Sequence, residues 1–134
     1  MLKYRYFWLS AGWLLISLVL YLSLMPHPPE PLSFKNADKL EHAFSYAMLA
    51  LWFCQLYRSV KLRAAVVIAL VGLGVALEFV QGWTGYRMFD VLDMLANSVG
   101  VMLGWLLVLT PLGNLFVYIE KLKFHRNASS HHTE

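Results

Sequence analysis

Polar and ionisable residues recur at helical spacing inside otherwise apolar stretches of this chain. Asp90, Asp93, Asn97, Gly100 and Gly104 follow one another at steps of three or four residues. Such steps align side chains along one face of a helix. The polar residues of this stripe, from Asp90 to Asn97, could do chemistry, although Asn97 could equally serve as a hydrogen-bonding link between helices. The glycines at its other end are typical of close packing between membrane helices.

Two further stretches carry polar residues in the same way. One holds Asp38, His42 and Tyr46, and the other holds Glu78 and Gln81. The charge-free runs beside them, 43–57 and 64–77, would reach only about 21–23 Å, short of a hydrocarbon core of roughly 30 Å. His42 and Glu78 are therefore expected at a similar depth inside the membrane. Ionisable groups at such depth normally face a bundle interior or a wet cavity, so we predict one shared polar cluster.

Carboxylates grouped around one histidine suit several kinds of chemistry. They could bind a hard divalent cation, act as a general acid–base pair on a lipid-linked phosphate, or relay protons. No spacing here matches a known metal signature. A Ser–His–acid triad is disfavoured, because Ser45 lies one turn from His42 along the same helix. No cofactor is expected other than such a cation.

Arg87 precedes the third polar stretch and is the arginine closest to its acids. A guanidinium can bind a carboxylate through two hydrogen bonds. We therefore predict that Arg87 pairs with Asp90 or Glu78, or with Asp93. The simpler alternative for Asp90, and for Asp38 in the first stretch, is that each only caps a helix.

The elements that must position this cluster are four transmembrane helices. Residues 6–26 carry no charge, and about 20 apolar residues cross the hydrocarbon core. No small–x–small cleavage pattern follows, so this helix is expected to be retained. Four prolines at 26, 28, 29 and 31 then predict a stiff loop. Further helices are expected near 38–57, at 64–83 and from 90 to at least 111.

Local signals refine the ends of these elements. Asn36 or Asp38 is expected to cap the second helix, and Glu41 would complete a capping box with Asp38. Residues 1–120 are predicted to form one membrane domain, followed by a polar, disordered tail over 121–134. The pair His131-His132 in this tail is too small to form a metal site alone.

The composition agrees with an all-α integral membrane protein. Hydrophobic residues make up 59% of the 134 residues, too many for a soluble domain of this size. The net charge is only +3 and the basic residues form no single patch, so the expected partner is the lipid bilayer and not nucleic acid. Cys54 is the only cysteine, which excludes a disulfide within the chain.

The distribution of basic residues between the two sides of the membrane predicts the orientation of the chain. With the N-terminus inside, the inner segments carry eight basic residues: Lys3, Arg5, Arg58, Lys61, Arg63, Lys121, Lys123 and Arg126. The outer segments carry three, Lys35, Lys39 and Arg87. This bias favours both termini in the cytoplasm, with the polar cluster near the opposite face of the membrane.

At these residues the sequence resembles the VanZ-like family. The resemblance covers about residues 36–108 and rests on Asp38-Lys39, His42, Tyr46, Glu78, Gln81, Arg87, Asp90, Asp93, Asn97 and Gly100. It implies a multi-pass protein of the bacterial plasma membrane. The family is named for an accessory protein of glycopeptide-resistance clusters that is associated with raised teicoplanin resistance.

Two functions of different classes follow. The first is a non-enzymatic membrane module that binds a lipid-linked ligand or a lipopeptide at the outer leaflet. Such a module could contribute to teicoplanin-type resistance or to lipid homeostasis of the cell envelope. The second is a small hydrolase or transferase acting on a phospholipid or a polyprenyl phosphate. The lack of a nucleophile signature or a phosphate-cradling loop favours the first, and the residues themselves leave catalysis and oligomeric state open.

Overall fold

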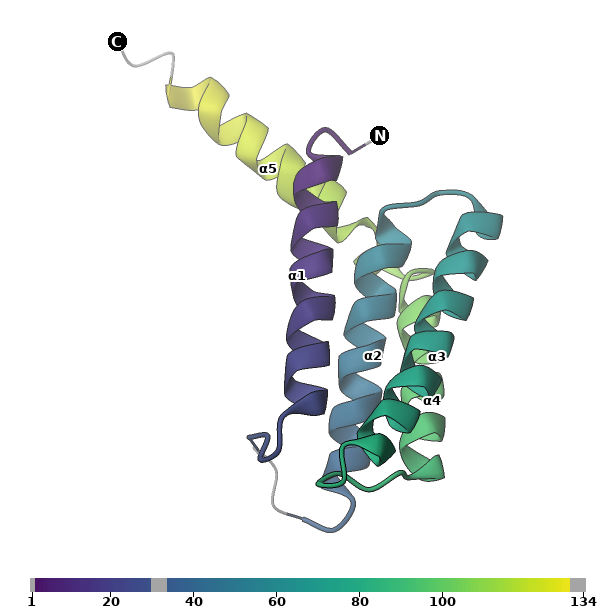
Figure 1. Cartoon of the computed structure of the whole chain (residues 1–134). Helices are drawn as coiled ribbons and strands as arrows, with labels where there is room; N and C mark the ends of the chain where they lie inside the picture. Colours follow the sequence, from purple (N-terminus) through teal and green to yellow (C-terminus); the bar gives the residue numbers. More distant parts are fainter. Residues whose placement is uncertain (1, 30–33, 131–134) are drawn as a thin grey trace.

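The described part of the chain forms an upright bundle of four helices, and a fifth helix leaves it at one end (Figure 1). The computed structural model describes residues 2–29 and 34–130, with side chains up to residue 123. All regular structure in these residues is helical, as expected from the sequence. The elements are α1 (Arg5–Leu24), α2 (Ala37–Gln55), α3 (Val60–Trp83), α4 (Val91–Leu107), the short 3-10 helix η1 (Pro111–Asn114) and α5 (Leu115–Ser130).

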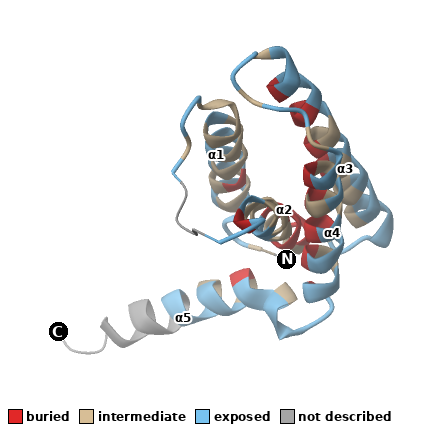
Figure 2. Cartoon of the chain, turned by 90° about the horizontal axis from the view of Figure 1, so that it is seen from below, coloured by how far each residue is buried: buried red, intermediate tan, exposed pale blue. Residues whose placement is uncertain are grey.

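Helix α2 is central, because it contacts α1, α3, α4 and η1 and packs most extensively against α4. Buried residues gather where α2, α3 and α4 face one another (Figure 2). The closest approach joins α2 to α4: a Cβ added at Gly100 would lie 2.1 Å from the Ala43 carbonyl oxygen. One added at Gly104 would lie 2.2 Å from that of Ala47. Only residues without a side chain fit there, so these two glycines set the distance between the helices.

The membrane-spanning character differs among the helices. In the described part of the chain, α1 and α3 are long and apolar enough to cross a membrane. Helix α4 passes the same test only together with residues 111–123, as a pair bent by 75°. Helix α2 carries Asp38, Lys39 and Glu41 in its first turns. The expectation of four spans is therefore confirmed for two helices, or for three if the bent pair is one span.

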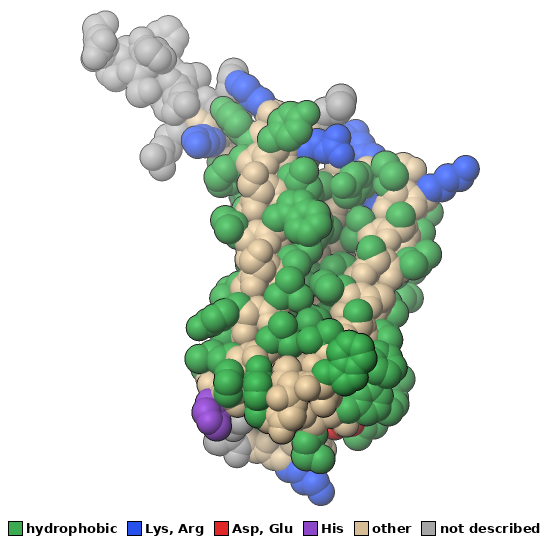
Figure 3. All heavy atoms as spheres, viewed as in Figure 1, with side chains coloured by type: hydrophobic (Ala, Val, Ile, Leu, Met, Phe, Trp, Pro, Cys, Tyr) green, Lys and Arg blue, Asp and Glu red, His purple; other side chains and the backbone are tan. Residues whose placement is uncertain are grey.

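The two ends of the bundle differ in charge, whereas its sides are covered by hydrophobic side chains (Figure 3). Lysine and arginine gather at the end that holds the N-terminus, which we call the basic end (residues 2–5, 57–63 and 116–123). The opposite end, called the cluster end, holds residues 22–29, 34–42 and 78–93. The predicted polar residues lie at or just below this cluster end.

The predicted capping box at the start of α2 is wrong. Asn36 stands at the cap position in a left-handed conformation with φ 64°, and its side chain caps no backbone group. Asp38 binds the neighbouring Lys39 instead of reaching back to cap the helix with Glu41. Asp38 thereby belongs to the group of acids that surround Lys39 at the cluster end. Pro31, part of the expected proline loop, lies outside the described residues.

Helix α5 begins before the predicted tail and continues through most of it. Residues 121–130, expected to be disordered, are helical, and the histidine pair lies outside the described residues. The Glu120 carboxylate accepts hydrogen bonds from the backbone N–H groups of Lys3 and Tyr4 at 2.7 and 2.9 Å. It also accepts one from Trp8 Nε1, and the Trp8 ring stacks on Phe116. These contacts attach α5 to the start of α1.

Candidate functional site

Lys39 lies among the acids of the cluster end. Its Nζ atom is 2.8 Å from Asp38 Oδ2, 2.5 Å from Asp90 Oδ2 and 2.7 Å from Asp93 Oδ1. The ammonium offsets the mutual repulsion of three carboxylates that come from α2, the loop before α4, and α4 itself. The sequence analysis noted Lys39 in a motif but assigned it no role. Its place three residues before His42 on the same helical face was the available signal.

Asp90 has two roles. Its Oδ1 atom accepts the backbone N–H of Leu92 at 2.8 Å, so it caps α4 as the simpler interpretation held. Its Oδ2 atom binds Lys39, and this hydrogen bond lowers the pKa of the Asp90 carboxyl below its ordinary value. The cap therefore also ties α4 to the first turn of α2.

His42 is oriented by two residues of α4. Its Nδ1 atom lies 3.0 Å from Asn97 Oδ1, and its Nε2 atom lies 3.7 Å from Asp93 Oδ2. Both ring nitrogens thus face α4, and neither is directed to Ser45. This geometry lacks the serine–histidine contact that a catalytic triad needs. Asp93 and Asn97 are buried, which holds the imidazole in one orientation.

Glu78 lies within the bundle and does not face lipid, since its side chain is only 1% exposed. Its Oε1 atom accepts the backbone N–H of Asp90 at 2.9 Å, whereas its Oε2 atom is buried and has no hydrogen-bond partner within the described residues. Gln81, one turn further, donates instead to the Ser23 carbonyl oxygen at 2.8 Å. Gln81 therefore fastens α3 to the end of α1 and does not join the carboxylates.

Tyr46 lies one turn below His42 and is likewise 1% exposed. Its hydroxyl is buried and has no hydrogen-bond partner among the described residues. A Cβ added at Gly74 would lie 3.2 Å from the Tyr46 ring and 3.0 Å from Asn97 Cβ. Helices α2, α3 and α4 thus meet directly beneath the polar cluster.

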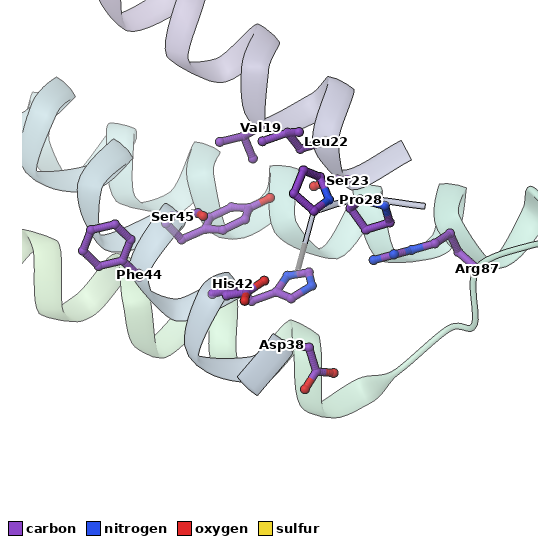
Figure 4. A pocket seen from close by; sticks show the side chains of 12 residues that line it. Val19, Leu22, Ser23, Pro28, Asp38, His42, Phe44, Ser45 and Arg87 are labelled. Carbon is purple, nitrogen blue, oxygen red and sulfur yellow. The ribbon is translucent and has the colours of Figure 1, made fainter. Parts of the chain in front are cut away.

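A cavity of about 360 Å³ lies beside the cluster, between α1, α2 and the following loops (Figure 4). It has an apolar wall and a polar wall. The residues that line it are Val19, Leu22, Ser23, Pro28, Pro29, Asp38, Glu41, His42, Phe44, Ser45, Tyr46 and Arg87. A second, more polar cavity of about 630 Å³ shares Asp38, Glu41 and Arg87 with the first. These three residues therefore lie at the boundary between the two cavities.

Arg87 extends from the loop between α3 and α4 toward Pro28 (Figure 4). In the part of the chain that the structure describes, its guanidinium forms no ion pair. The prediction that Arg87 pairs with an acid of the cluster is wrong, because Lys39 binds Asp90 and Asp93. Glu78, the third predicted partner, accepts the backbone N–H of Asp90 instead. The guanidinium is consequently available to a ligand in either cavity.

The predicted divalent cation stays a prediction. Among the described side chains, those of residues 2–29 and 34–123, no three His, Cys, Asp or Glu residues are grouped as metal ligands. The acids that do converge surround the ammonium of Lys39. A cation at this place would have to displace the lysine.

Comparison with known proteins identifies the family. The model of the VanZ/LLP1 family matches residues 7–117, which is most of the chain. This chain belongs to the VanZ/LLP1 family. The match is longer than the 36–108 region that carried the motifs, so it also includes α1. No solved structure matches the chain.

A relative of this VanZ/LLP1 protein is an uncharacterised protein of Schizosaccharomyces pombe. The two are 34% identical over 90 residues, which cover 65% of this chain and 53% of the relative. The chain thus spans about half the length of the curated relative that it matches. Because that relative comes from a yeast, sequences of this kind are not confined to bacteria.

Proposed function

We propose that this VanZ/LLP1 protein binds an amphiphilic molecule, either a lipid-linked compound or a lipopeptide, at the outer leaflet of a bacterial plasma membrane. In this arrangement four helices span the bilayer, and both termini lie in the cytoplasm. By holding such a molecule, the protein would influence teicoplanin-type resistance or lipid homeostasis of the cell envelope. The alternative, a hydrolase or transferase for phospholipid or polyprenyl phosphate, has less support.

The cavity is the observation that carries this proposal. Val19 and Leu22 of α1 give it an apolar wall, while Arg87 and His42 give it charged and polar groups. A ligand with both a hydrocarbon chain and a polar headgroup matches this combination. Pockets for small molecules usually have this form, with a few polar groups on a mainly apolar lining.

Two buried polar atoms on residues that line the cavity favour a ligand with hydrogen-bonding groups. The Tyr46 hydroxyl and Glu41 Oε1 are both buried without hydrogen-bond partners, and both residues line the cavity. An unpaired buried polar group costs about 1–3 kcal/mol. A ligand or water molecules that pair these atoms would recover that free energy, so the unpaired atoms favour a binding role for this space.

The charge distribution supports the orientation. Eight of the eleven basic residues of the sequence fall on segments of the basic end or its continuation, and three fall on the cluster end. The excess of lysine and arginine on cytoplasmic segments is the rule for membrane proteins. Under that rule the cluster end faces the outside.

In the described part of the chain, Ser45 is not paired with His42 as an activated nucleophile would be. Ser45 lines the cavity, yet both ring nitrogens of His42 face α4. A serine without a neighbouring base is a weak nucleophile. Binding therefore accounts for the arrangement with fewer assumptions than catalysis.

A cavity-filling substitution tests the proposal. The full-length protein in detergent is titrated with a fluorescent phospholipid, in the parent form and as Ser45→Phe. We expect Ser45→Phe to weaken binding about ten-fold or more, because its ring would occupy space that the ligand needs. Ser10→Phe, which changes an exposed serine of α1 away from the cavity, should bind like the parent. Equal affinity of all three proteins would contradict the proposal.

A further inference from the structure

We infer that the cavity selects a headgroup that carries both a phosphate and a primary ammonium group. This inference rests on the proposed function and adds the chemical class of the ligand. It follows from how the charges at the cluster end are paired, and from which of them are left over.

Acids outnumber cations around the two cavities. Four carboxyl groups line the two cavities, on Asp38, Glu41, Asp90 and Asp93. The permanently charged cations beside them are Lys39 and Arg87, and Lys39 is shared by three of the acids. An acidic site of this kind attracts a ligand that brings a positive charge.

Glu41 is the acid best placed to receive that charge. It lines both cavities and forms no ion pair among the described residues. Its Oε1 atom is buried and lacks a hydrogen-bond donor. Lys39, the nearest lysine in sequence, is already engaged by other carboxylates. A positive group of the ligand is therefore the missing partner of Glu41.

The missing partner must donate hydrogen bonds. A primary ammonium has three N–H donors, whereas a quaternary ammonium has none and binds to the faces of aromatic rings. Of the four aromatic residues that line the two cavities, Phe34, Phe44 and Tyr86 are more than half exposed, and Tyr46 is buried in the bundle. They do not enclose a trimethylammonium group, so the lining favours ethanolamine over choline.

Arg87 supplies the opposite charge. Its guanidinium lines the same two cavities as Glu41 and is paired neither with Glu41 nor with any other described acid. Guanidinium groups bind phosphate through two parallel hydrogen bonds. A zwitterion placed at the junction of the cavities would thus meet Arg87 with its phosphate and Glu41 with its ammonium. Its chains would then lie along Val19 and Leu22.

Headgroup selectivity is the test. The full-length protein in detergent is titrated by native mass spectrometry with phosphatidylethanolamine, phosphatidylcholine and phosphatidylglycerol that share the same acyl chains. Glycerophosphoethanolamine, which lacks chains, is the fourth ligand. We expect phosphatidylethanolamine to bind about ten-fold more tightly than the other lipids, the change that one charge-assisted hydrogen bond produces. Glycerophosphoethanolamine should bind more weakly than phosphatidylethanolamine.

Substitutions test separately whether Glu41 binds the ammonium group and whether Arg87 binds the phosphate. Glu41→Gln keeps the shape of the side chain and should reduce the preference for phosphatidylethanolamine over phosphatidylglycerol. Arg87→Gln should weaken binding of every phospholipid, and Arg87→Lys should recover part of it. Lys35→Gln, which changes an exposed lysine of the same end that lines neither cavity, should leave all affinities unchanged. Circular dichroism of each variant establishes that it is folded.

The possible failures are distinguishable. If the three lipids bind equally and Glu41→Gln changes nothing, the headgroup inference is overturned while the amphiphile site remains. If no lipid binds to the folded protein, the proposed function fails. If glycerophosphoethanolamine binds as tightly as the lipid, headgroup recognition holds and the contribution of the chains is refuted.

Discussion

The Glu78 carboxylate accepts the backbone N–H of Asp90 at 2.9 Å, so the last turns of α3 hold the residue that caps α4. Asp90 in turn binds Lys39 of α2. One buried carboxylate thereby helps to position three helices at the cluster end. These contacts explain how a loop residue and two helices present their polar groups to the same cavities.

Substitution of Glu78 separates its hydrogen bond from its charge. Glu78→Gln retains an oxygen that can accept the Asp90 N–H, so we expect a thermal midpoint close to that of the parent. Glu78→Leu leaves this N–H unpaired and should lower the free energy of unfolding by about 1–3 kcal/mol. Unfolding of the purified protein in detergent measures both. A Glu78→Leu variant as stable as Glu78→Gln would show that the hydrogen bond is unimportant.

Removal of the Lys39 charge should destabilise the cluster end. Lys39→Met keeps the length of the side chain but leaves three carboxylates without their shared cation. We expect a loss of roughly 1–3 kcal/mol, less than for a fully buried pair because the Lys39 side chain is 21% exposed. Lys35→Met, at an exposed position nearby, is the matched control and should change stability little. Similar losses in both variants would argue against a specific role for Lys39.

Packing of α2 against α4 should depend on Gly100. The added methyl group of Gly100→Ala would meet the Ala43 carbonyl oxygen at 2.1 Å, so the helices must separate. We expect a loss of about 1–3 kcal/mol or failure to fold, as for other overpacked sites. Gly72→Ala places the same group where nothing lies within 4 Å and should be tolerated. If both variants unfold alike, the close approach of α2 to α4 does not limit stability.

The sequence predicted the helices because their signals are local. Charge-free length and helical spacing placed α1, α2 and α3 close to their observed positions, and the steps between Asp90 and Gly104 correctly grouped one face of α4. The predicted end of α4 is wrong, because the helix stops at Leu107 and not at or beyond 111. The sequence also predicted the burial of Glu78, because a carboxylate in an apolar membrane helix normally faces the interior of the bundle. Such features depend on neighbours within a turn or two.

The choice of ion-pair partners could not be derived in this way. Lys39 and Arg87 both lie at the cluster end, and sequence spacing favoured the arginine because it stands close to Asp90 along the chain. In the folded chain, Lys39 reaches Asp90 across 51 positions of sequence. Which cation approaches the acids depends on the packing of α2 against α4, and no local pattern reports that. Gln81 was misplaced for the same reason, because its partner Ser23 belongs to α1.

The orientation in the membrane gives a further prediction. A reporter fused after Glu134 should be active only in the cytoplasm, and one inserted near Pro29 only outside. The reason is the excess of basic residues on the segments of the basic end. A C-terminal fusion active outside would refute the proposed orientation and would place the cavity at the inner leaflet.

The most direct measurement of amphiphile binding is protection of a thiol placed inside the cavity. Cys54, the one native cysteine, is buried, so the thiol introduced by Ser45→Cys should dominate the reaction with a maleimide. Ser10→Cys, at an exposed position of α1, is the matched control. Short-chain phosphatidylethanolamine and phosphatidylglycerol are each added to the full-length protein in detergent. Our account predicts saturable slowing of the reaction at position 45 and none at position 10, whereas equal rates at position 45 with and without either lipid would contradict it.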